Sequence, residues 1–291
     1  MKQSFIGIAL IYFLLGCQET STPSISNHLF ADSPLSVPLV SGIIDEASGL
    51  ADSKANAGLL WVEQDSGNPP ELALLAYNGS FKKKIFIKGA VNRDWEDLAL
   101  AKGPDASLNY IYLADIGDNS LQYNNYFIYR FPEPAVSVDS VLAWEKITFQ
   151  YPDGPHNAEA IFVDDSSKAI YIFTKSDLKS KIFRLAYPQN STGVITATLV
   201  GELPFGEAVG AAISPNGREM IIKTYTALNY WSRQTGESIE TALKRSPTNL
   251  SYKLEIQGEA VCFKNDNSGF YTLSEKPAIS TFVELNFYKR N

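Results

Sequence analysis

The chain has 291 residues and a formal net charge of −7 at pH 7, with 25 Lys and Arg against 32 Asp and Glu. This acidic balance leaves no basic surface for nucleic acid, so no nucleic-acid partner is expected. Of two cysteines, only Cys262 lies in the part expected to fold, which excludes a disulfide within that domain. Its neighbours Val261 and Phe263 predict an inert core thiol.

Residues 1–16 are predicted to be a signal peptide, because an apolar run from Phe5 to Leu15 is too short to span a bilayer. The run ends in Leu14-Leu15-Gly16-Cys17, which resembles a bacterial lipobox and implies that Cys17 is lipidated. The alternative is an ordinary secretory peptide. The lipobox places the protein in the bacterial cell envelope, with the membrane as its partner, as an outer-membrane lipoprotein that is periplasmic or surface-facing. Residues 17–33, rich in Ser, Thr and Pro, are expected to form a flexible tether before one domain over residues 34–291.

A short phrase then recurs along the domain. It combines Glu-Ala or Glu-Asp with an apolar run, and a degenerate copy begins at Gly210 in place of glutamate. The copies are 46–50, 96–100, 159–163, 210–214 and 259–263. A period of about 50 residues indicates a repeat architecture.

Each period divides into four short runs rich in aromatic and β-branched residues, separated by Asn, Gly, Asp, Ser and Pro. In the second period the expected strands are 95–100, 110–114, 126–131 and 145–151, and in the third they are 159–163, 169–173, 181–185 and 197–202. Four strands per unit predict an all-β fold, a β-propeller. One helical piece, 238–244, is expected as a surface insertion.

The last period offers three strands, ending with 282–288, and residues 36–40 can supply the fourth. We therefore expect five blades closed by an N-terminal strand, which leaves no long edge exposed. Six blades remain the alternative if the long second period hides a further hairpin.

The first strand of each blade lines the central channel, so the repeated glutamates should meet at one mouth of it. These are Glu46, Glu96, Glu159 and Glu259. Segments that follow each second strand, such as Asp65–Asn68 and Asp115–Asn119, should share this mouth. Carboxylates at one axis repel unless a cation, protonation or basic partners offset them. Oxygen ligands favour Ca²⁺, whereas the domain has too few His and Cys residues for zinc. The alternative is that each glutamate fixes blade register through backbone hydrogen bonds.

Catalytic candidates lie beside the glutamates. His156, the only imidazole of the expected domain, and Asp97 are candidate general bases near neutral pH, and His156 can equally be a structural hydrogen-bonding residue. Four basic side chains are expected near the acids and can bind an anionic substrate: Arg93, Lys175, Lys223 and Lys276. The alternative is that they form ion pairs between blades.

Four phrases, 93–97, 115–119, 156–160 and 257–260, resemble those of secreted bacterial propeller proteins of largely uncharacterised function, over nearly the whole mature chain. A more distant similarity is to calcium-dependent apyrases, five-bladed propellers with Ca²⁺ in the central tunnel. That resemblance implies Ca²⁺ at Glu46, Glu96, Glu159 and Glu259. Two hypotheses follow. One is a Ca²⁺-dependent hydrolase of an anionic ester, phosphoester or lactone, and the other is a lipoprotein that binds a ligand or protein partner without chemistry.

Overall fold

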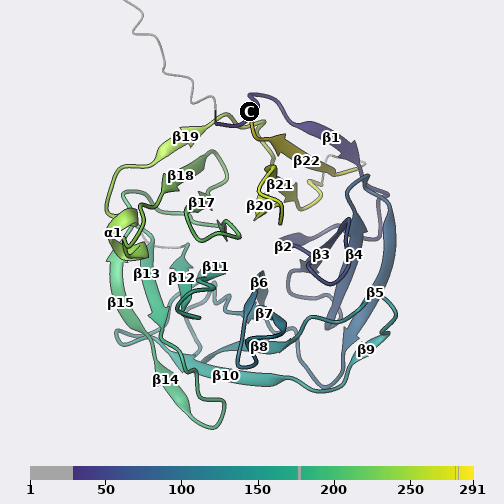
Figure 1. Ribbon diagram of the computed structural model, residues 1–291. Helices are drawn as coiled ribbons and strands as arrows, with labels where there is room; N and C mark the ends of the chain where they lie inside the picture. Colours follow the sequence, from purple (N-terminus) through teal and green to yellow (C-terminus); the bar gives the residue numbers. More distant parts are fainter. Residues whose placement is uncertain (1–28, 176–177, 279, 281) are drawn as a thin grey trace, which may run out of the picture.

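The computed structural model describes residues 29–175, 178–278, 280 and 282–291, and these residues form five β-sheets arranged in a ring (Figure 1). The predictions of a signal peptide at 1–16 and of a lipidated Cys17 fall outside the described residues. Each sheet begins at the central axis and ends at the circumference, so the chain is a five-bladed β-propeller. The expected fold class is confirmed.

The first two blades have five strands each. Blade 1 contains β2 (Ala47–Asp52), β3 (Leu59–Gln64), β4 (Glu71–Ala76), β5 (Phe81–Ile87) and β9 (Ser140–Val141). Blade 2 contains β6 (Trp95–Lys102), β7 (Asn109–Asp115), β8 (Tyr126–Pro132), β10 (Glu145–Gln150) and β14 (Val194–Thr196).

The other blades have four strands. Blade 3 contains β11 (Ala158–Val163), β12 (Ile170–Thr174), β13 (Lys181–Leu185) and β15 (Thr198–Glu202). Blade 4 contains β16 (Gly210–Ile213), β17 (Glu219–Lys223), β18 (Leu228–Ser232) and β19 (Thr248–Leu250). Blade 5 contains β20 (Gly258–Phe263), β21 (Gly269–Ser274), β22 (Glu284–Lys289) and β1 (Leu35–Pro38).

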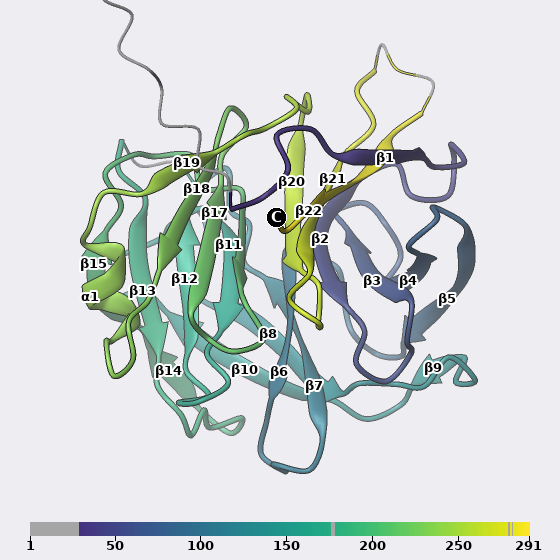
Figure 2. The same ribbon diagram turned by 45° about the horizontal axis from the view of Figure 1, so that its top comes forward.

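An N-terminal strand closes the ring, as the sequence predicted. Strand β1 pairs antiparallel with β22, with Leu35 opposite Phe287 and Pro38 opposite Glu284 (Figure 2). Phe30 also belongs to the last blade, because it is buried and bridges Arg290, ahead of residue 34 where the domain was expected to begin. This closure joins the two ends of the domain in one sheet.

The long second period holds no sixth blade. Its extra residues form β9, which pairs in parallel with β5 and so extends the outer edge of blade 1. In the same way β14, from the third period, pairs in parallel with β10 on the edge of blade 2. These short strands cover two sheet edges that would otherwise be exposed.

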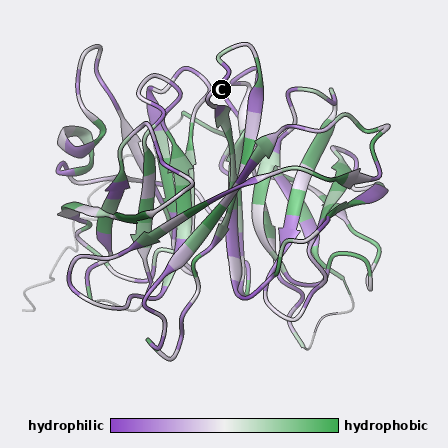
Figure 3. Ribbon diagram, turned by 90° about the horizontal axis from the view of Figure 1, so that it is seen from below, coloured by the Kyte–Doolittle hydropathy of each residue, from purple (hydrophilic) through white to green (hydrophobic). Residues whose placement is uncertain are grey.

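The core lies between neighbouring blades, because each sheet buries both of its faces. Green, hydrophobic segments concentrate on the strands, and the loops carry more of the purple, hydrophilic residues (Figure 3). Between blades 2 and 3, for example, Tyr112 and Phe149 share one buried cluster with Ile172 and Phe183. Cys262 is buried, as expected of a core thiol.

The expected surface helix is present as α1 (Ile239–Leu243). Ser238 caps its N-terminus by accepting a hydrogen bond from the Thr241 N–H at 3.1 Å. In the part of the chain that the structure describes, no helix is long and apolar enough to cross a membrane.

Candidate functional site

A recurrent irregularity shapes the inner strands at one mouth of the channel. In β2, β6, β11 and β20 the register shifts by one residue at the second strand position, which leaves one residue without a cross-strand partner. The residues at this shift are Ser48, Glu96, Glu159 and Glu259. A β-bulge bends its strand and re-aims the side chain, and here it gathers three glutamates and one serine.

The register corrects the alignment of Glu46 with the other glutamates. Ser48 occupies the bulge in blade 1, and Glu46 lies two residues earlier, where its carbonyl accepts a hydrogen bond from the Asp65 N–H at 3.0 Å. In blades 2, 3 and 5 this earlier position belongs to Asp94, Asn157 and Gln257. The Glu46 side chain is exposed and accepts a hydrogen bond from Asn68 at 2.5 Å.

Blade 4 contributes no carboxylate because there is no room for one. Gly210 precedes Ala211, which faces Ile222 as Ala260 faces Leu273 in blade 5. A Cβ atom built on Gly210 would overlap the carbonyl oxygen of Glu259. The degenerate fourth copy of the repeat therefore lets two inner strands approach closely.

Glu159 and Glu259 share one amine at the mouth. The Lys175 Nζ lies 2.6 Å from Oε1 of Glu159 and 3.8 Å from Oε1 of Glu259. Tyr225 donates to Oε1 of Glu259 at 2.7 Å, and Ser48 donates to its Oε2 at 3.0 Å. Burial opposes the charge on Lys175, but Glu159 and Tyr225 outweigh this effect, so its pKa is raised overall.

Glu159 combines a near-neutral pKa with a free oxygen. Burial raises its pKa to about 7, against the opposing effect of the Lys175 ammonium. Asn157 donates to Oε1 at 3.2 Å, whereas Oε2 is buried without a hydrogen-bond partner among the described residues. An orphaned buried carboxylate oxygen indicates a missing proton, water or cation.

A second group of carboxyls forms no ion pair with a lysine among the described residues. Carboxylate oxygens of Asp65, Asp94 and Glu96 lie within 4.8 Å of one another, and Glu96 is buried. Burial raises the pKa of Asp65 to about 6 and that of Glu96 well above its ordinary value, and neighbouring carboxylates add to both shifts. Burial likewise raises the pKa of Asp94. This acidic triad can hold a metal ion.

The loop after β7 holds the triad together. A Cβ atom at Gly117 would overlap Oε1 of Glu96 and Oδ2 of Asp94, so a larger residue there would displace the two carboxyls. The Gly117 N–H donates to the Asp94 carbonyl at 3.1 Å. The sequence Asp115–Asn119 thus serves as a tight support for the triad.

Asp97 lies deeper in the channel wall and is 1% exposed. Its oxygens accept hydrogen bonds from the backbone N–H groups of Leu98 and Ile161, each at 2.8 Å, which ties β6 to β11. Burial raises its pKa well above the ordinary value despite these bonds. Its contacts are those of a residue that fixes the register between blades.

The other predicted base, His156, turns away from the triad. Its Nε2 lies 2.9 Å from Oδ1 of Asp153, and the ring packs against Tyr151 and Phe183. Arg93 also turns toward its own blade, where its guanidinium stacks 3.9 Å from the Tyr123 ring centre.

Two predicted substrate-binding lysines form ion pairs. Lys223 is fully buried against Glu255, and burial lowers its pKa. Lys276 pairs with Asp45 at the rim of blades 5 and 1. Of the four predicted basic residues, Lys175 is the one that the structure places against the channel glutamates.

Sequence reasoning named the segments but missed several acids at this mouth. Asp65 and Glu275 lie in the expected loops after second strands, and Asp94 lies in the phrase 93–97. Burial raises the pKa of Glu275 to about 8, and Glu259, Asp65 and Glu46 add to the shift. Glu63, also missed, is fully buried. The signal available for it in the sequence was a charged residue directly after the apolar run 59–62.

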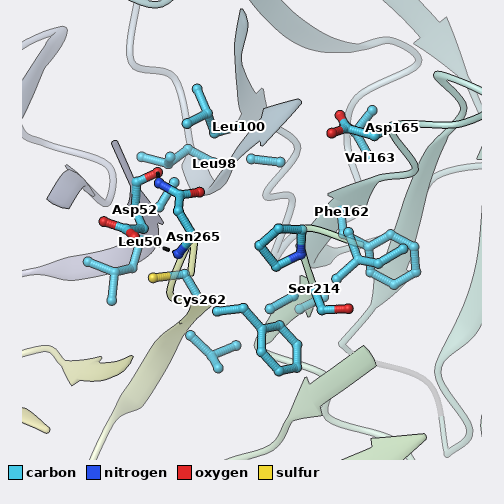
Figure 4. Close-up of a pocket in the computed structure, with 18 of the residues that line it drawn as sticks. Leu50, Asp52, Leu98, Leu100, Phe162, Val163, Asp165, Ser214, Cys262 and Asn265 are labelled. Atoms are coloured by element: carbon cyan, nitrogen blue, oxygen red, sulfur yellow. Dashed lines mark hydrogen bonds between the residues drawn. The ribbon is translucent and has the colours of Figure 1, made fainter. Parts of the chain in front are cut away.

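A groove of about 660 Å³ opens beside Lys175 between blades 3 and 4. The opposite mouth differs: a smaller cavity of about 70 Å³ is lined mainly by apolar residues such as Leu50, Leu98 and Phe162 (Figure 4). There Asn265 donates its N–H to Asp52 at 2.7 Å. Among the described residues, none of the predicted site residues lines this second cavity.

No protein-family model matches the sequence, and no curated protein matches it. Many solved structures are similar to this chain, and two of the distant ones are as follows. Kuenenia stuttgartiensis hydrazine synthase has a TM-score of 0.40 and 11% identity, over 80% of this chain and 56% of that chain. An auxiliary nutrient binding protein from Bacteroides thetaiotaomicron has a TM-score of 0.48 and 8% identity, over 90% of this chain and 73% of that chain.

Proposed function

We propose that the protein is a Ca²⁺-dependent hydrolase of an anionic ester, phosphoester or lactone. The observation that carries this proposal is the triad of Asp65, Asp94 and Glu96, which forms no ion pair with a lysine in the described part of the chain and lies at the same mouth as Glu159. The apyrase resemblance suggests the same ion at Glu46, Glu96, Glu159 and Glu259, of which Glu96 alone belongs to the triad. Here the ligands are the triad, and Glu46 is outside it.

The donor set fits Ca²⁺ better than zinc or magnesium. All three side chains offer oxygen, and His156 is bound to Asp153. Ligand oxygens up to 4.8 Å apart suit an ion whose bonds to oxygen are about 2.3–2.6 Å, whereas the octahedron of magnesium is tighter. When bound, the ion would supply electrophilic stabilisation to an ester or phosphoryl oxygen.

Glu159 is the proposed general base. Its pKa of about 7 leaves a substantial fraction ionised at neutral pH, and Oε2 is free to accept a proton from water. The water oxygen would bond to the carbonyl carbon or phosphorus, the bond to the leaving alkoxide would break, and the alkoxide would take up the proton. Lys175, which lines the groove, would hold the anionic group of the substrate.

Calorimetry with Ca²⁺ and hydrolysis of 4-nitrophenyl phosphate, a carboxylated 4-nitrophenyl ester and δ-valerolactone test this proposal. Asp94→Asn should weaken Ca²⁺ binding at least tenfold, while Asp139→Asn, at an exposed ion pair with Lys83, should leave it unchanged. Glu159→Gln should retain Ca²⁺ and lose hydrolysis at least tenfold. Absence of Ca²⁺ binding would overturn the proposal.

The second candidate is a binding protein without chemistry. One observation favours it: neither predicted base faces the groove, because His156 is held by Asp153 and Asp97 is held by backbone N–H groups. Ca²⁺ binding with no hydrolysis of any of the three probes would support this candidate over the hydrolase.

We also propose that Cys17 carries a lipid and anchors the protein to a membrane of the bacterial envelope. The proposed membrane is the outer membrane. The support is the lipobox-like sequence Leu14-Leu15-Gly16-Cys17. Partition of the full-length protein into the detergent phase of Triton X-114 is the check, and recovery in the aqueous phase would contradict the anchor.

A further inference from the structure

The groove beside Lys175 has a lining unlike that of the channel. Five uncharged polar side chains contribute to it, Asn119, Asn157, Asn229, Thr224 and Thr226, together with the carboxylate of Glu207. Asn157, Asn229 and Thr224 are buried and bonded within the protein, whereas Asn119 and Thr226 are exposed, so their carboxamide and hydroxyl groups can donate and accept hydrogen bonds. Such a surface matches ligand hydroxyl groups, which also donate and accept.

One wall of the groove is aromatic and is joined to Lys175. Phe205 is half-buried and packs 6.2 Å from Trp231, so its ring is held in place. Glu207, two residues later, has a φ of 61° and donates its N–H to the Lys175 carbonyl at 3.1 Å. A non-glycine residue in the left-handed region is uncommon and is a frequent feature of functional loops. An aromatic ring beside amides and hydroxyls suits the C–H face of a sugar ring.

The charges of the carboxyls around the channel mouth limit which anionic group a ligand of the groove can carry. Seven carboxyls of the described residues gather at the mouth: Glu46, Asp65, Asp94, Glu96, Glu159, Glu259 and Glu275. Lys175 is the basic group in contact with two of them. Even with a divalent cation on the triad, so much negative charge disfavours a dianionic phosphate more than a single carboxylate.

We infer that the ligand of this groove is an acidic saccharide, whose carboxylate lies at Lys175 and the cation and whose hydroxyls bind Asn119 and Thr226. The inference rests on the proposed function, because it narrows the anionic substrate of the same mouth to a hydroxyl ester of a sugar acid, such as an O-acetyl ester, in which the carboxylate stays free. A volume of about 660 Å³ lies within the range of pockets that hold small ligands, roughly 300–1,000 Å³.

Titration calorimetry on the full-length protein, first with Ca²⁺ alone and then with sugars, tests the inference. D-galacturonate should bind at least tenfold more tightly than galactose or galactose 6-phosphate. Thr226→Val and Asn119→Ala, at exposed positions of the groove, should each weaken galacturonate binding at least threefold. Asn249→Ala, at an exposed position on the outer strand β19 of the same blade, is the matched control and should change nothing.

Lys175→Met should remove the preference for galacturonate over galactose, and the melting temperature checks that this variant is folded. Equal binding of galacturonate and galactose by the natural protein, or tighter binding of the phosphate, would overturn the inference. Ca²⁺ binding with no sugar binding would overturn it too, yet leave the proposed function standing. Galacturonate binding without any Ca²⁺ binding would leave the carboxylate at Lys175 alone, and it would overturn both the cation contact and the Ca²⁺-dependent hydrolase.

Discussion

Glu63 shows what burial does to a single carboxyl in this channel. The side chain is 0% exposed and reaches past Gly49, where a Cβ atom would come within 2.8 Å of Oε1. Burial is the main cause that raises its pKa well above the ordinary value, and the nearby Asp97 and Asp65 carboxylates raise it further. The native protein therefore binds a proton that the unfolded chain releases near neutral pH.

Glu63→Gln is expected to stabilise the protein at pH 8 and to have little effect at pH 4.5. Each unit by which folding raises a carboxyl pKa costs about 1.4 kcal/mol above that pKa, and glutamine carries no such cost. Thermal unfolding at the two pH values measures the difference, with Glu202→Gln, exposed on β15, as the control. Equal destabilisation at both pH values would show that the carboxyl itself is required.

The position of Glu46 marks the limit of residue-level prediction. The repeated letters Glu-Ala align Glu46 with Glu159 and Glu259, but hydrogen-bond register places Ser48 there. A shift of two residues keeps the same alternation of faces along a strand, so the hydrophobic pattern does not expose the error. The pairing of Asp94 with Asp65 was also beyond the sequence, because it depends on how close Gly117 lets the loop approach.

At the scale of elements, the strands with a clear local hydrophobic pattern could be predicted from the sequence. The expected strand 126–131 is β8 (Tyr126–Pro132), and the expected 181–185 is β13 (Lys181–Leu185). Both are alternating or apolar runs bounded by turn residues. The short strands β9 and β14 were missed because two or three residues carry no period, and their pairing with another blade is a long-range contact.

Gly210→Ala is expected to destabilise the protein by about 1–3 kcal/mol, the usual cost of extra atoms in a packed interior. The added methyl would meet the Glu259 carbonyl, which forces β16 away from β20. Chemical denaturation measures this cost, and Gly193→Ala is the matched control because a Cβ there meets nothing within 4 Å. Equal stabilities of the two variants would contradict the close approach of these inner strands.

At the scale of the whole molecule, the ring brings acids that are far apart in sequence to one axis. Asp65, Glu159 and Glu275 come from blades 1, 3 and 5, and burial is the first cause that raises their pKa values to about 6, 7 and 8. The fold therefore works against ionisation at this mouth. A bound cation would favour the ionised carboxylates, so the stability of the protein should depend on both the pH and the metal.

The sign of this coupling can be tested in EDTA. Between the ordinary value of a carboxyl and its raised pKa, the native protein holds more protons than the unfolded chain, so stability falls as pH rises. For the values of about 6, 7 and 8 the fall should extend from pH 5 to pH 8. Each proton retained adds a slope of at most about 1.4 kcal/mol per pH unit, less where solvent screens the group.

Ca²⁺ should reverse this slope, because the ion binds carboxylates after they lose their protons and binds the native state alone. Melting temperatures at pH 5, 6.5 and 8 are therefore expected to decrease in EDTA and to rise or stay level in millimolar Ca²⁺. Glu275→Gln should flatten the EDTA curve between pH 6.5 and pH 8, where that carboxyl loses its proton. A melting temperature in EDTA that is constant or increases over this range would mean that the acids do not share a low-dielectric mouth, and the proposed cation site would lose its electrostatic basis.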